Sequence, residues 1–328
     1  MKPFAHFNAT SMDEAVEILG RYGGRAAVIA GGTDLLGRMK DLVLPSYPEA
    51  LVNIKTIPGL DAVGEDRGYL KIGALTRLSA LASHPAVRAE YSALAEAADR
   101  TASPHLRNLG TIGGNLCQDI RCWYYRGPNN RFSCLRKGGG RCYALKGDNR
   151  FHSIFGASVE QGCVAVHPSD TAPVLIALDA EVETSKRTMK VMDLFTVRPL
   201  RTTVLDPDEI LTGVRIPVPS PGTKGAFLKF AQRKSIDFPI VNCAAMLTFD
   251  EGVVKEARIC LNAVYVTPRR AYAAERALAG RFLDEETAAE AAREAIADAR
   301  PLQHNAYMVQ VARTLVKRAL LACGGQGE

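Results

Sequence analysis

Residues 26–35, with the sequence AAVIAGGTDL, decide the fold of the N-terminal region. The apolar run 26–30 predicts a short strand, and 35–39 predicts the start of a helix. Gly31 and Gly32 lie at the junction, where backbone without a Cβ lets N–H groups approach a ligand closely. A strand, a glycine turn and a helix N-terminus could together bind a pyrophosphate. The spacing matches neither G-x-G-x-x-G nor a P-loop, and the five residues around the two glycines, taken alone, favour an ordinary turn.

A second glycine-rich stretch, RNLGTIGGN, occupies residues 107–115. Gly113 and Gly114, flanked by Thr111 and Asn115, offer another set of backbone and side-chain donors. One such loop is weak support for a phosphate site. A dinucleotide, however, carries a long polar chain that needs several backbone donors, so the two loops together predict a dinucleotide site.

A proline-rich stretch divides the chain into two parts with different predicted elements. Pro217, Pro219 and Pro221 mark this boundary. The pair Ser11 and Glu14 is typical of a capping box. The predicted helices before the boundary cover residues 12–22, 76–83, 87–98 and 170–178, and the predicted strands cover 51–54, 69–72, 163–167 and 181–184. After it, strands over 225–231, 241–249 and 253–264 and helices over 268–279, 285–299 and 305–322 predict a small antiparallel sheet with helices.

Length and composition indicate a globular chain. It has 328 residues, of which 47% are hydrophobic and 23% charged, and a chain of this length has room for about two domains. The longest apolar runs fall far short of the roughly 18 residues that a membrane-spanning helix needs. The first ten residues lack the apolar core of a signal peptide. We therefore expect a cytoplasmic protein without a membrane partner.

Residues 117–163 form a Cys-rich segment without periodicity. Five of the eight cysteines lie here: Cys117, Cys122, Cys134, Cys142 and Cys163. In a reducing compartment, metal ligation is favoured over disulfides. Four thiolates could hold either an iron–sulfur cluster or a structural zinc. Because no C-x2-C pair is present, the spacing alone leaves both open.

Positive charge concentrates in the same region. Residues 117–150 contain eight basic and two acidic side chains, a net charge of +6 that equals the charge of the whole chain. Basic residues would offset the negative charge of thiolates. The interleaved aromatic residues are Trp123, Tyr124, Tyr125, Phe132 and Tyr143. They leave nucleic-acid binding as an alternative, but we favour aromatic shielding of a metal centre and expect no nucleic acid.

With residues 30–35, 107–115 and the motif PSDTAP at 168–173 in this order, the chain resembles the FAD-binding medium subunits of the molybdenum hydroxylases. That family includes xanthine dehydrogenase and carbon monoxide dehydrogenase flavoproteins. The resemblance covers essentially the whole chain and implies an α+β fold. A two-part FAD-binding domain of PCMH type would span residues 1–220, with subdomains of about 1–55 and 56–220. A C-terminal domain of the CO dehydrogenase flavoprotein type would span 223–328.

Residues 119–170 resemble an insert that a minority of the family uses to bind a 4Fe–4S cluster. The resemblance implies Cys122, Cys134, Cys142 and Cys163 as ligands. In the 4-hydroxybenzoyl-CoA reductase pattern the last cysteine stands where this sequence has Phe151, whereas the aldehyde-oxidoreductase arrangement matches Cys163. Cys117 is the competing fourth ligand, and its closeness to the second glycine loop leaves it near the flavin instead.

The resemblance also implies the flavin contacts, and it implies no catalytic residue. The contacts with the pyrophosphate and the ADP half would come from the first loop: Ile29, Ala30, Gly31, Gly32, Thr33, Asp34 and Leu35. The second loop would add Thr111, Gly113, Gly114 and Asn115. Ser169 and Asp170 would meet a ribityl or ribose hydroxyl, and Lys229 would approach the isoalloxazine. Thr101 and Asn108 are further contacts.

The implied function is electron transfer within an oxidoreductase whose substrate chemistry lies elsewhere. Molybdenum would lie on a large partner subunit and 2Fe–2S clusters on a small one, in a dimer of heterotrimers. The basic residues 121–150, Arg136 and Lys137 among them, favour an acidic external carrier such as ferredoxin, with NAD as the alternative. We expect a 4-hydroxybenzoyl-CoA reductase first and an aldehyde or N-heterocycle (xanthine-type) dehydrogenase second.

Overall fold

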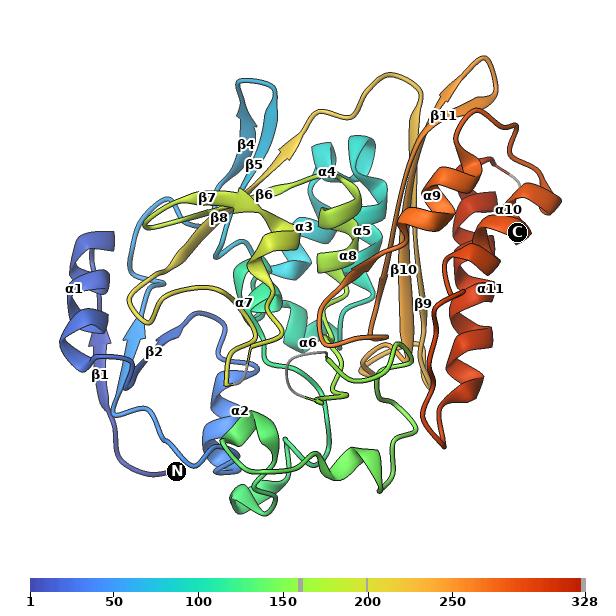
Figure 1. Cartoon of the computed structure of the whole chain (residues 1–328). Coiled ribbons are helices and arrows are strands. Elements are labelled where there is room, and N and C mark those ends of the chain that lie inside the picture. Colours follow the sequence, from blue (N-terminus) through green and yellow to red (C-terminus); the bar gives the residue numbers. More distant parts are fainter. Residues whose placement is uncertain (159–161, 199, 326–328) are drawn as a thin grey trace.

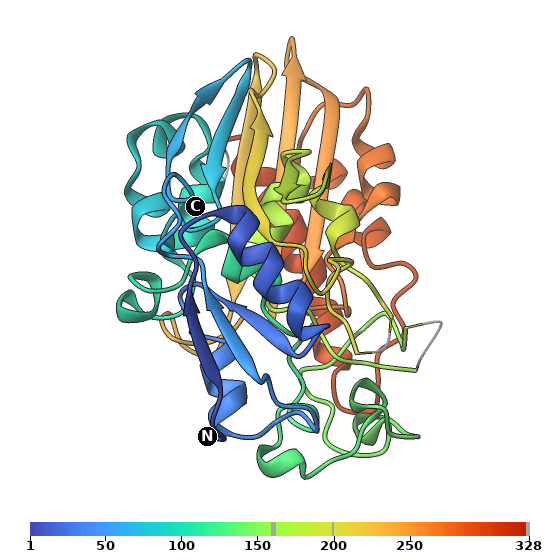
Figure 2. The same cartoon turned by 90° about the vertical axis from the view of Figure 1, so that its left-hand side faces the viewer.

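The computed structural model describes residues 1–158, 162–198 and 200–325. Three sheets follow one another along the chain (Figure 1). The first is parallel, has the order β1-β3-β2, and consists of β1 (Ala5–Asn8), β2 (Ala26–Ile29) and β3 (Ala50–Asn53). Helix α1 (Met12–Tyr22) covers one face of this sheet (Figure 2), and the short helix α2 (Leu35–Lys40) follows β2.

The second sheet is antiparallel and forms the centre of the N-terminal two thirds. Its order is β4-β5-β8-β6-β7, and its strands are β4 (Val63–Asp66), β5 (Tyr69–Gly73), β6 (Glu181–Thr184), β7 (Thr188–Lys190) and β8 (Leu211–Pro217). The helices of this region are α3 (Leu78–Ser83), α4 (Pro85–Glu90), α5 (Ser92–Asp99), α6 (Pro104–Arg107), α7 (Ile112–Cys117) and α8 (Thr171–Ala177), with a 3-10 turn at Val191–Leu194. Helix α8 is completely buried, because helices and strands surround it.

The third sheet belongs to the C-terminal part. Its order is β12-β11-β10-β9, and its strands are β9 (Thr223–Phe230), β10 (Val241–Asp250), β11 (Val253–Asn262) and β12 (Arg269–Arg270). The outer face carries α9 (Tyr272–Leu278), α10 (Glu285–Glu294) and α11 (Ala306–Cys323) (Figure 1). The inner face packs on α5 and α8. One apolar core therefore joins the second and third sheets.

The Cys-rich segment has no strand and only three 3-10 turns among its described residues: η1 (Pro128–Asn130), η2 (Leu135–Lys137) and η3 (Tyr143–Leu145). A small apolar cluster forms its interior, in which Ile120 and Tyr125 are buried together with Ala165 and Val266 from outside the segment. Trp123, the single tryptophan of the chain, lies half-exposed against Phe151 and donates its Nε1–H to the Asp148 carbonyl at 3.0 Å. Below we call residues 117–163 the insert.

Several predicted elements differ from the observed ones. Ser11 caps α1 by accepting the Glu14 N–H at 3.2 Å, but the Glu14 carboxylate accepts from Thr10, so only half of the capping box forms. The predicted helix 87–98 is interrupted at Tyr91, whose backbone leaves the helical region between α4 and α5. The predicted strand 163–167 is wrong, because only one isolated bridge, between Arg121 and Val166, forms there.

Of the strands in the described residues, the prediction missed five: β1, β4, β7, β8 and β12, the last of which falls inside a predicted helix. All of them except β8 have only two to four residues, and they form because a neighbouring strand provides hydrogen-bond partners, which local periodicity does not reveal. Among the described residues, no helix combines the length and the apolarity needed to cross a bilayer.

Candidate functional site

The two glycine loops touch each other through their backbones. A Cβ on Gly31 would lie 2.1 Å from the Leu109 carbonyl oxygen, so no larger residue fits there without moving one of the loops. Gly32 has φ +70°, a left-handed conformation that only glycine adopts readily. The turn after β2 therefore needs both glycines, one for its closeness to the second loop and one for its shape.

The second loop packs against Ala74, which directly follows β5. Thr111 caps α7 by accepting the Gly114 N–H at 3.1 Å. A Cβ on Gly113 would lie 2.9 Å from the Cβ and the carbonyl oxygen of Ala74. This packing presses α7 against the central sheet and leaves Gly114 exposed.

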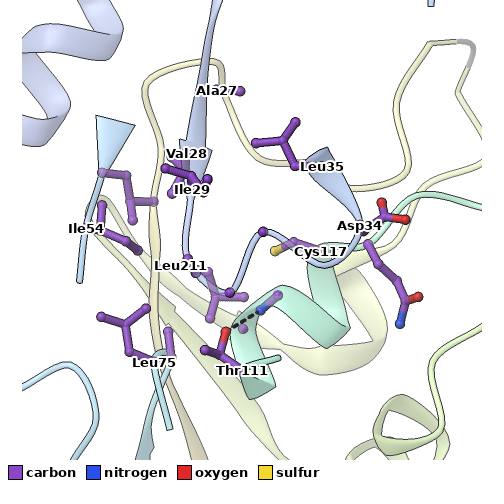
Figure 3. A pocket seen from close by; sticks show the side chains of 18 of the residues that line it. Ala27, Val28, Ile29, Asp34, Leu35, Ile54, Leu75, Thr111, Cys117 and Leu211 are labelled. Atoms are coloured by element: carbon purple, nitrogen blue, oxygen red, sulfur yellow. Dashed lines mark hydrogen bonds between the residues drawn. The ribbon is translucent and has the colours of Figure 1, made fainter. Parts of the chain in front are cut away.

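Two adjoining pockets run along these loops. The first is lined by both loops and by Arg38, Ile54, Leu75, Cys117 and Leu211, among others. Figure 3 shows Ile54 and Leu75 on one side of it and Asp34 on the other. The second is lined by residues that include Thr101, Asn115, Asp170 and Phe238. The pockets share Thr33, Asp34, Thr111, Gly114 and Gln118, so together they form one long groove, which suits an extended ligand.

Hydroxyl groups orient Asn115 in the second pocket. Its Oδ1 accepts from Ser169 Oγ at 2.5 Å and from Thr171 Oγ1 at 2.7 Å. With the oxygen engaged in this way, the Nδ2 group is the end of the amide that can donate to a ligand. Ser169 itself does not line the groove. Its hydroxyl holds the Asn115 side chain in position.

Asp170 and Lys229 form a buried ion pair between the two large parts of the chain. Lys229 Nζ donates to Asp170 Oδ2 at 2.7 Å and to the Arg100 carbonyl at 2.8 Å, and Asn242 donates to Asp170 Oδ1. Burial raises the pKa of Asp170, against the opposing effect of Lys229. Asp170 lines the groove, whereas Lys229 does not. We therefore expect Lys229 to act on a flavin through Asp170.

Asp34 is surrounded by arginines. Arg126 Nη1 and Arg121 Nη2 lie 2.7 and 3.1 Å from its Oδ1, and Arg38 Nε lies 3.4 Å from its Oδ2. Burial alone would raise the pKa of Asp34, but the arginines outweigh burial and lower it below its ordinary value. The Asp34 carboxylate is therefore occupied by arginine side chains.

Asp119, a residue of the insert, binds Arg38 of α2. It accepts from Arg38 at 2.8 Å, from Thr202 at 2.5 Å and from the Tyr125 hydroxyl. Burial would raise the pKa of Asp119, but Arg38 and Arg126 lower it well below its ordinary value. The carboxylate is therefore ionised in the folded protein at neutral pH.

The four cysteines predicted as ligands line one small pocket. Cys122, Cys134, Cys142 and Cys163 surround it together with Tyr124, Tyr125, Tyr143, Ile120 and Leu135, among others. Cys117 lines the groove instead, and burial raises the pKa of its thiol to about 12, which makes it an unreactive thiol.

The predicted basic surface of the insert is partly wrong. Arg136 and Lys137 are only 3% and 6% exposed and lie beside the cysteines, because η2 turns both side chains inward. Arg121 and Arg126 are occupied with Asp34. The exposed cations of the insert are Arg131, Arg141, Lys146 and Arg150, the last of them paired with Asp148.

Most of the predicted flavin contacts do line the groove. The exceptions are Asn108, Ser169 and Lys229. Sequence reasoning missed Arg38 and Gln118, each one helical turn after a predicted residue, so helical spacing could have found them. It also missed Leu211 and residues 236–238, which strand β8 and the β9–β10 loop bring in from far along the chain.

Comparison with known proteins agrees with this geometry. The family model "FAD binding domain in molybdopterin dehydrogenase" matches residues 2–219, and "CO dehydrogenase flavoprotein C-terminal domain" matches residues 226–323. The chain belongs to the FAD-binding subunits of the molybdenum hydroxylase family. The expected α+β architecture, with a C-terminal domain of the CO dehydrogenase flavoprotein type, is confirmed.

Relatives of this FAD subunit serve several dehydrogenases. The aldehyde oxidoreductase FAD-binding subunit PaoB of Escherichia coli K12 is 36% identical over 288 residues, which cover 85% of this chain and 86% of that protein. The carbon monoxide dehydrogenase medium chain of Hydrogenophaga pseudoflava is 30% identical, covering 97% and 96%. A carbon monoxide dehydrogenase structure from the same organism, without the Mo-pyranopterin moiety, matches with a TM-score of 0.78 at 29% identity over all of both chains.

The groove of this FAD subunit fits the cofactor. Gly31, Gly32, Gly113 and Gly114 keep side chains away from its floor, and its apolar side at Ile54 and Leu75 suits a ring while the glycine loops suit a diphosphate. Residues of this FAD subunit therefore bind and orient a flavin, and FAD when bound supplies one- and two-electron redox chemistry.

Replacement of Gly31 tests the contact between the loops. In Gly31→Ala the new Cβ overlaps the Leu109 carbonyl, and overpacking of this kind costs about 1–3 kcal/mol. We expect FAD affinity to fall roughly tenfold or more, as measured by titration of the purified chain with FAD. Gly37→Ala in α2, where a Cβ meets nothing within 4 Å, is the control and should bind FAD normally. Equal affinities of the two variants would show that the loops need not touch.

The depressed pKa of Asp119 predicts acid sensitivity. Because the folded-state pKa is lower than the unfolded one, stabilisation is present above about pH 4 and is lost as the pH falls through the folded-state pKa. We expect the unfolding free energy of Asp119→Asn to fall less than that of wild type between about pH 6 and pH 3, by about 1–3 kcal/mol in denaturant titrations. The control Asp148→Asn, an exposed pair with Arg150, should behave as wild type does. Identical pH dependence in Asp119→Asn and wild type would refute the assignment.

Proposed function

We propose that this subunit carries a 4Fe–4S cluster beside its FAD and passes electrons between partner subunits and an external carrier. Cys122, Cys134, Cys142 and Cys163 would be the cluster ligands, in the pocket that they line together. A cluster with four thiolate ligands supplies one-electron steps, and FAD joins such steps to a two-electron reaction.

The observation that carries this proposal is a pair of buried cations that have no anionic partner among the residues that the structure describes. Lys137 Nζ has no hydrogen-bond partner among the described residues, nor have Nε and Nη1 of Arg136. Arg136 lines the cysteine pocket, and Lys137 acts electrostatically on Cys134 and Cys122. An unpaired buried charge costs several kcal/mol. Thiolates bound to a metal core supply the negative charge that these side chains need.

The spacing of the thiols favours a polynuclear cluster over one zinc ion. Tetrahedral zinc with Zn–S bonds of about 2.3 Å requires sulfurs about 3.8 Å apart. In the part of the chain that the structure describes, no three metal-binding side chains are close enough to share one ion. Yet the four cysteines line the same pocket, so they suit a larger inorganic core.

Several details of FAD binding belong to the same proposal. The adenine would lie against Ile54 and Leu75, the diphosphate along the two glycine loops, and the isoalloxazine in the pocket with Thr101, Asn115 and Asp170. We place the end of the FAD-binding domain at residue 220, in the segment between β8 and β9, and divide that domain near residue 55.

The partner subunits are inferred from the relatives. The names medium chain and FAD-binding subunit describe one part of a larger enzyme. We infer a large molybdenum subunit and a small 2Fe–2S subunit, in a dimer of heterotrimers. The identity with an aldehyde oxidoreductase subunit favours an aldehyde or N-heterocycle dehydrogenase. The 4-hydroxybenzoyl-CoA reductase that the sequence suggested first has no support among the relatives named above.

Metal analysis of cysteine variants tests the cluster. Anaerobically purified wild type should contain about four irons and one FAD per chain. Cys142→Ser should lose the iron, whereas Cys117→Ser, whose thiol lines the groove, should keep it. One zinc and no iron in wild type would refute the cluster while leaving FAD binding intact.

The exposed cations Arg131, Arg141 and Lys146 form the docking surface that we propose for an acidic carrier such as ferredoxin, with NAD as the alternative. Reversing all three charges to Glu should slow electron transfer to ferredoxin at low salt by about tenfold or more and should weaken its salt dependence. Reversal of Lys255, Arg293 and Arg313 in the C-terminal part changes net charge equally and should have little effect. Stopped-flow rates that are equal in both triple variants would exclude this surface, and reduction of NAD instead would identify the other carrier.

A further inference from the structure

We propose that Arg121 and Arg126 of the insert belong to the FAD site: through Asp34 they hold the glycine turn in the form that binds FAD. FAD affinity then depends on an ordered insert. The inference rests on FAD binding, and only its extension to metal loading rests on the proposed cluster.

The first step is the contact between the insert and the turn. Arg126 and Arg121 both reach Asp34 Oδ1, at 2.7 and 3.1 Å, and the backbone N–H of Asp119 donates to Asp34 Oδ2 at 3.1 Å. Asp34 follows directly after Gly32 and Thr33 in the turn and precedes α2. Three groups that lie at least 85 residues further along the chain thus fix the last residue of the turn.

The second step is the rigidity of the arginines themselves. Arg126 Nη2 donates to the Asp119 carbonyl at 2.8 Å, and its Nε donates to the Ile120 carbonyl at 3.1 Å. Its backbone N–H donates to the Cys122 carbonyl at 2.8 Å. We call the contacts of Arg121 and Arg126 with Asp34 the clamp. The segment 119–126 contains both arginines and also Cys122 of the cysteine pocket. We therefore infer that the clamp is ordered only when this part of the insert is ordered.

The third step is the balance of charge. Arg38, Arg121 and Arg126 face only Asp34 and Asp119 in this network, which leaves one positive charge in excess. Arg38 lines the first pocket and Arg121 the second, and the buried Nε of Arg121 has no hydrogen-bond partner among the described residues. A diphosphate at the junction of the pockets supplies the missing anion.

Thermodynamic linkage makes this coupling reciprocal. If an ordered insert raises the affinity for FAD, bound FAD stabilises the insert by the same factor. Coupling between sites in proteins commonly amounts to about 5- to 150-fold in affinity.

The test measures FAD dissociation constants for the full chain by calorimetry. Arg126→Met should weaken FAD binding about 5- to 150-fold. Arg150→Met removes another arginine of the insert that pairs with an aspartate, outside the network, and should bind FAD as wild type does. In an Asp34→Asn background the Arg126 substitution should have a much smaller effect, because the clamp then has no carboxylate to hold. Equal affinities for Arg126→Met and Arg150→Met, or an undiminished effect in Asp34→Asn, would overturn the inference.

Hydrogen exchange of the wild-type chain gives a second test that does not depend on the folding of a variant. Adding FAD should slow exchange at residues 119–126, and unchanged exchange there would refute the coupling. Cys142→Ser should weaken FAD binding in the same direction if metal orders the insert. Iron analysis of wild type separates the two ideas, since a chain without iron refutes the cluster, whereas the Arg126 result decides the clamp.

Discussion

The close contact between the two glycine loops is the constraint on which the rest of this structure depends. Gly31 can lie against the Leu109 carbonyl only because it has no side chain. The first loop is fixed by a small parallel sheet and the second by the end of the central antiparallel sheet. Their contact therefore sets how the two sheets lie relative to each other at this point, and the FAD groove runs along both loops.

Buried ionic groups also fix the parts of the chain relative to one another. Asp170 and Lys229 join the C-terminal sheet to α8, and Asp34 and Asp119 join the insert to the glycine turn. Such groups are costly to bury, and they are stable only when every partner is in place. They therefore specify one arrangement of the parts, whereas apolar packing alone would tolerate several.

The sequence predicted those parts of the site that are encoded locally. Glycines between a strand and a helix indicate a turn whose backbone must stay accessible, so residues 26–35 and 107–115 were enough to locate both loops. The choice of four cysteine ligands came from the resemblance, because the spacing of the five cysteines in residues 117–163 left an iron–sulfur cluster and a zinc ion both open. The ion pairs of Asp34, the inward turn of Arg136 and Lys137, and the contribution of residues 236–238 depend on tertiary contacts between distant segments. No local pattern distinguishes an arginine that faces water from one that lies buried beside sulfur atoms.

The position of Trp123 has a practical consequence. It is the only tryptophan among 328 residues, and it lies in the insert against Phe151, next to Cys122. Ultraviolet emission excited at the red edge of protein absorption therefore originates in this one segment, although the rest of the chain is far larger. The tryptophan fluorescence of the intact subunit therefore reports on the ordering of its Cys-rich insert without an attached label.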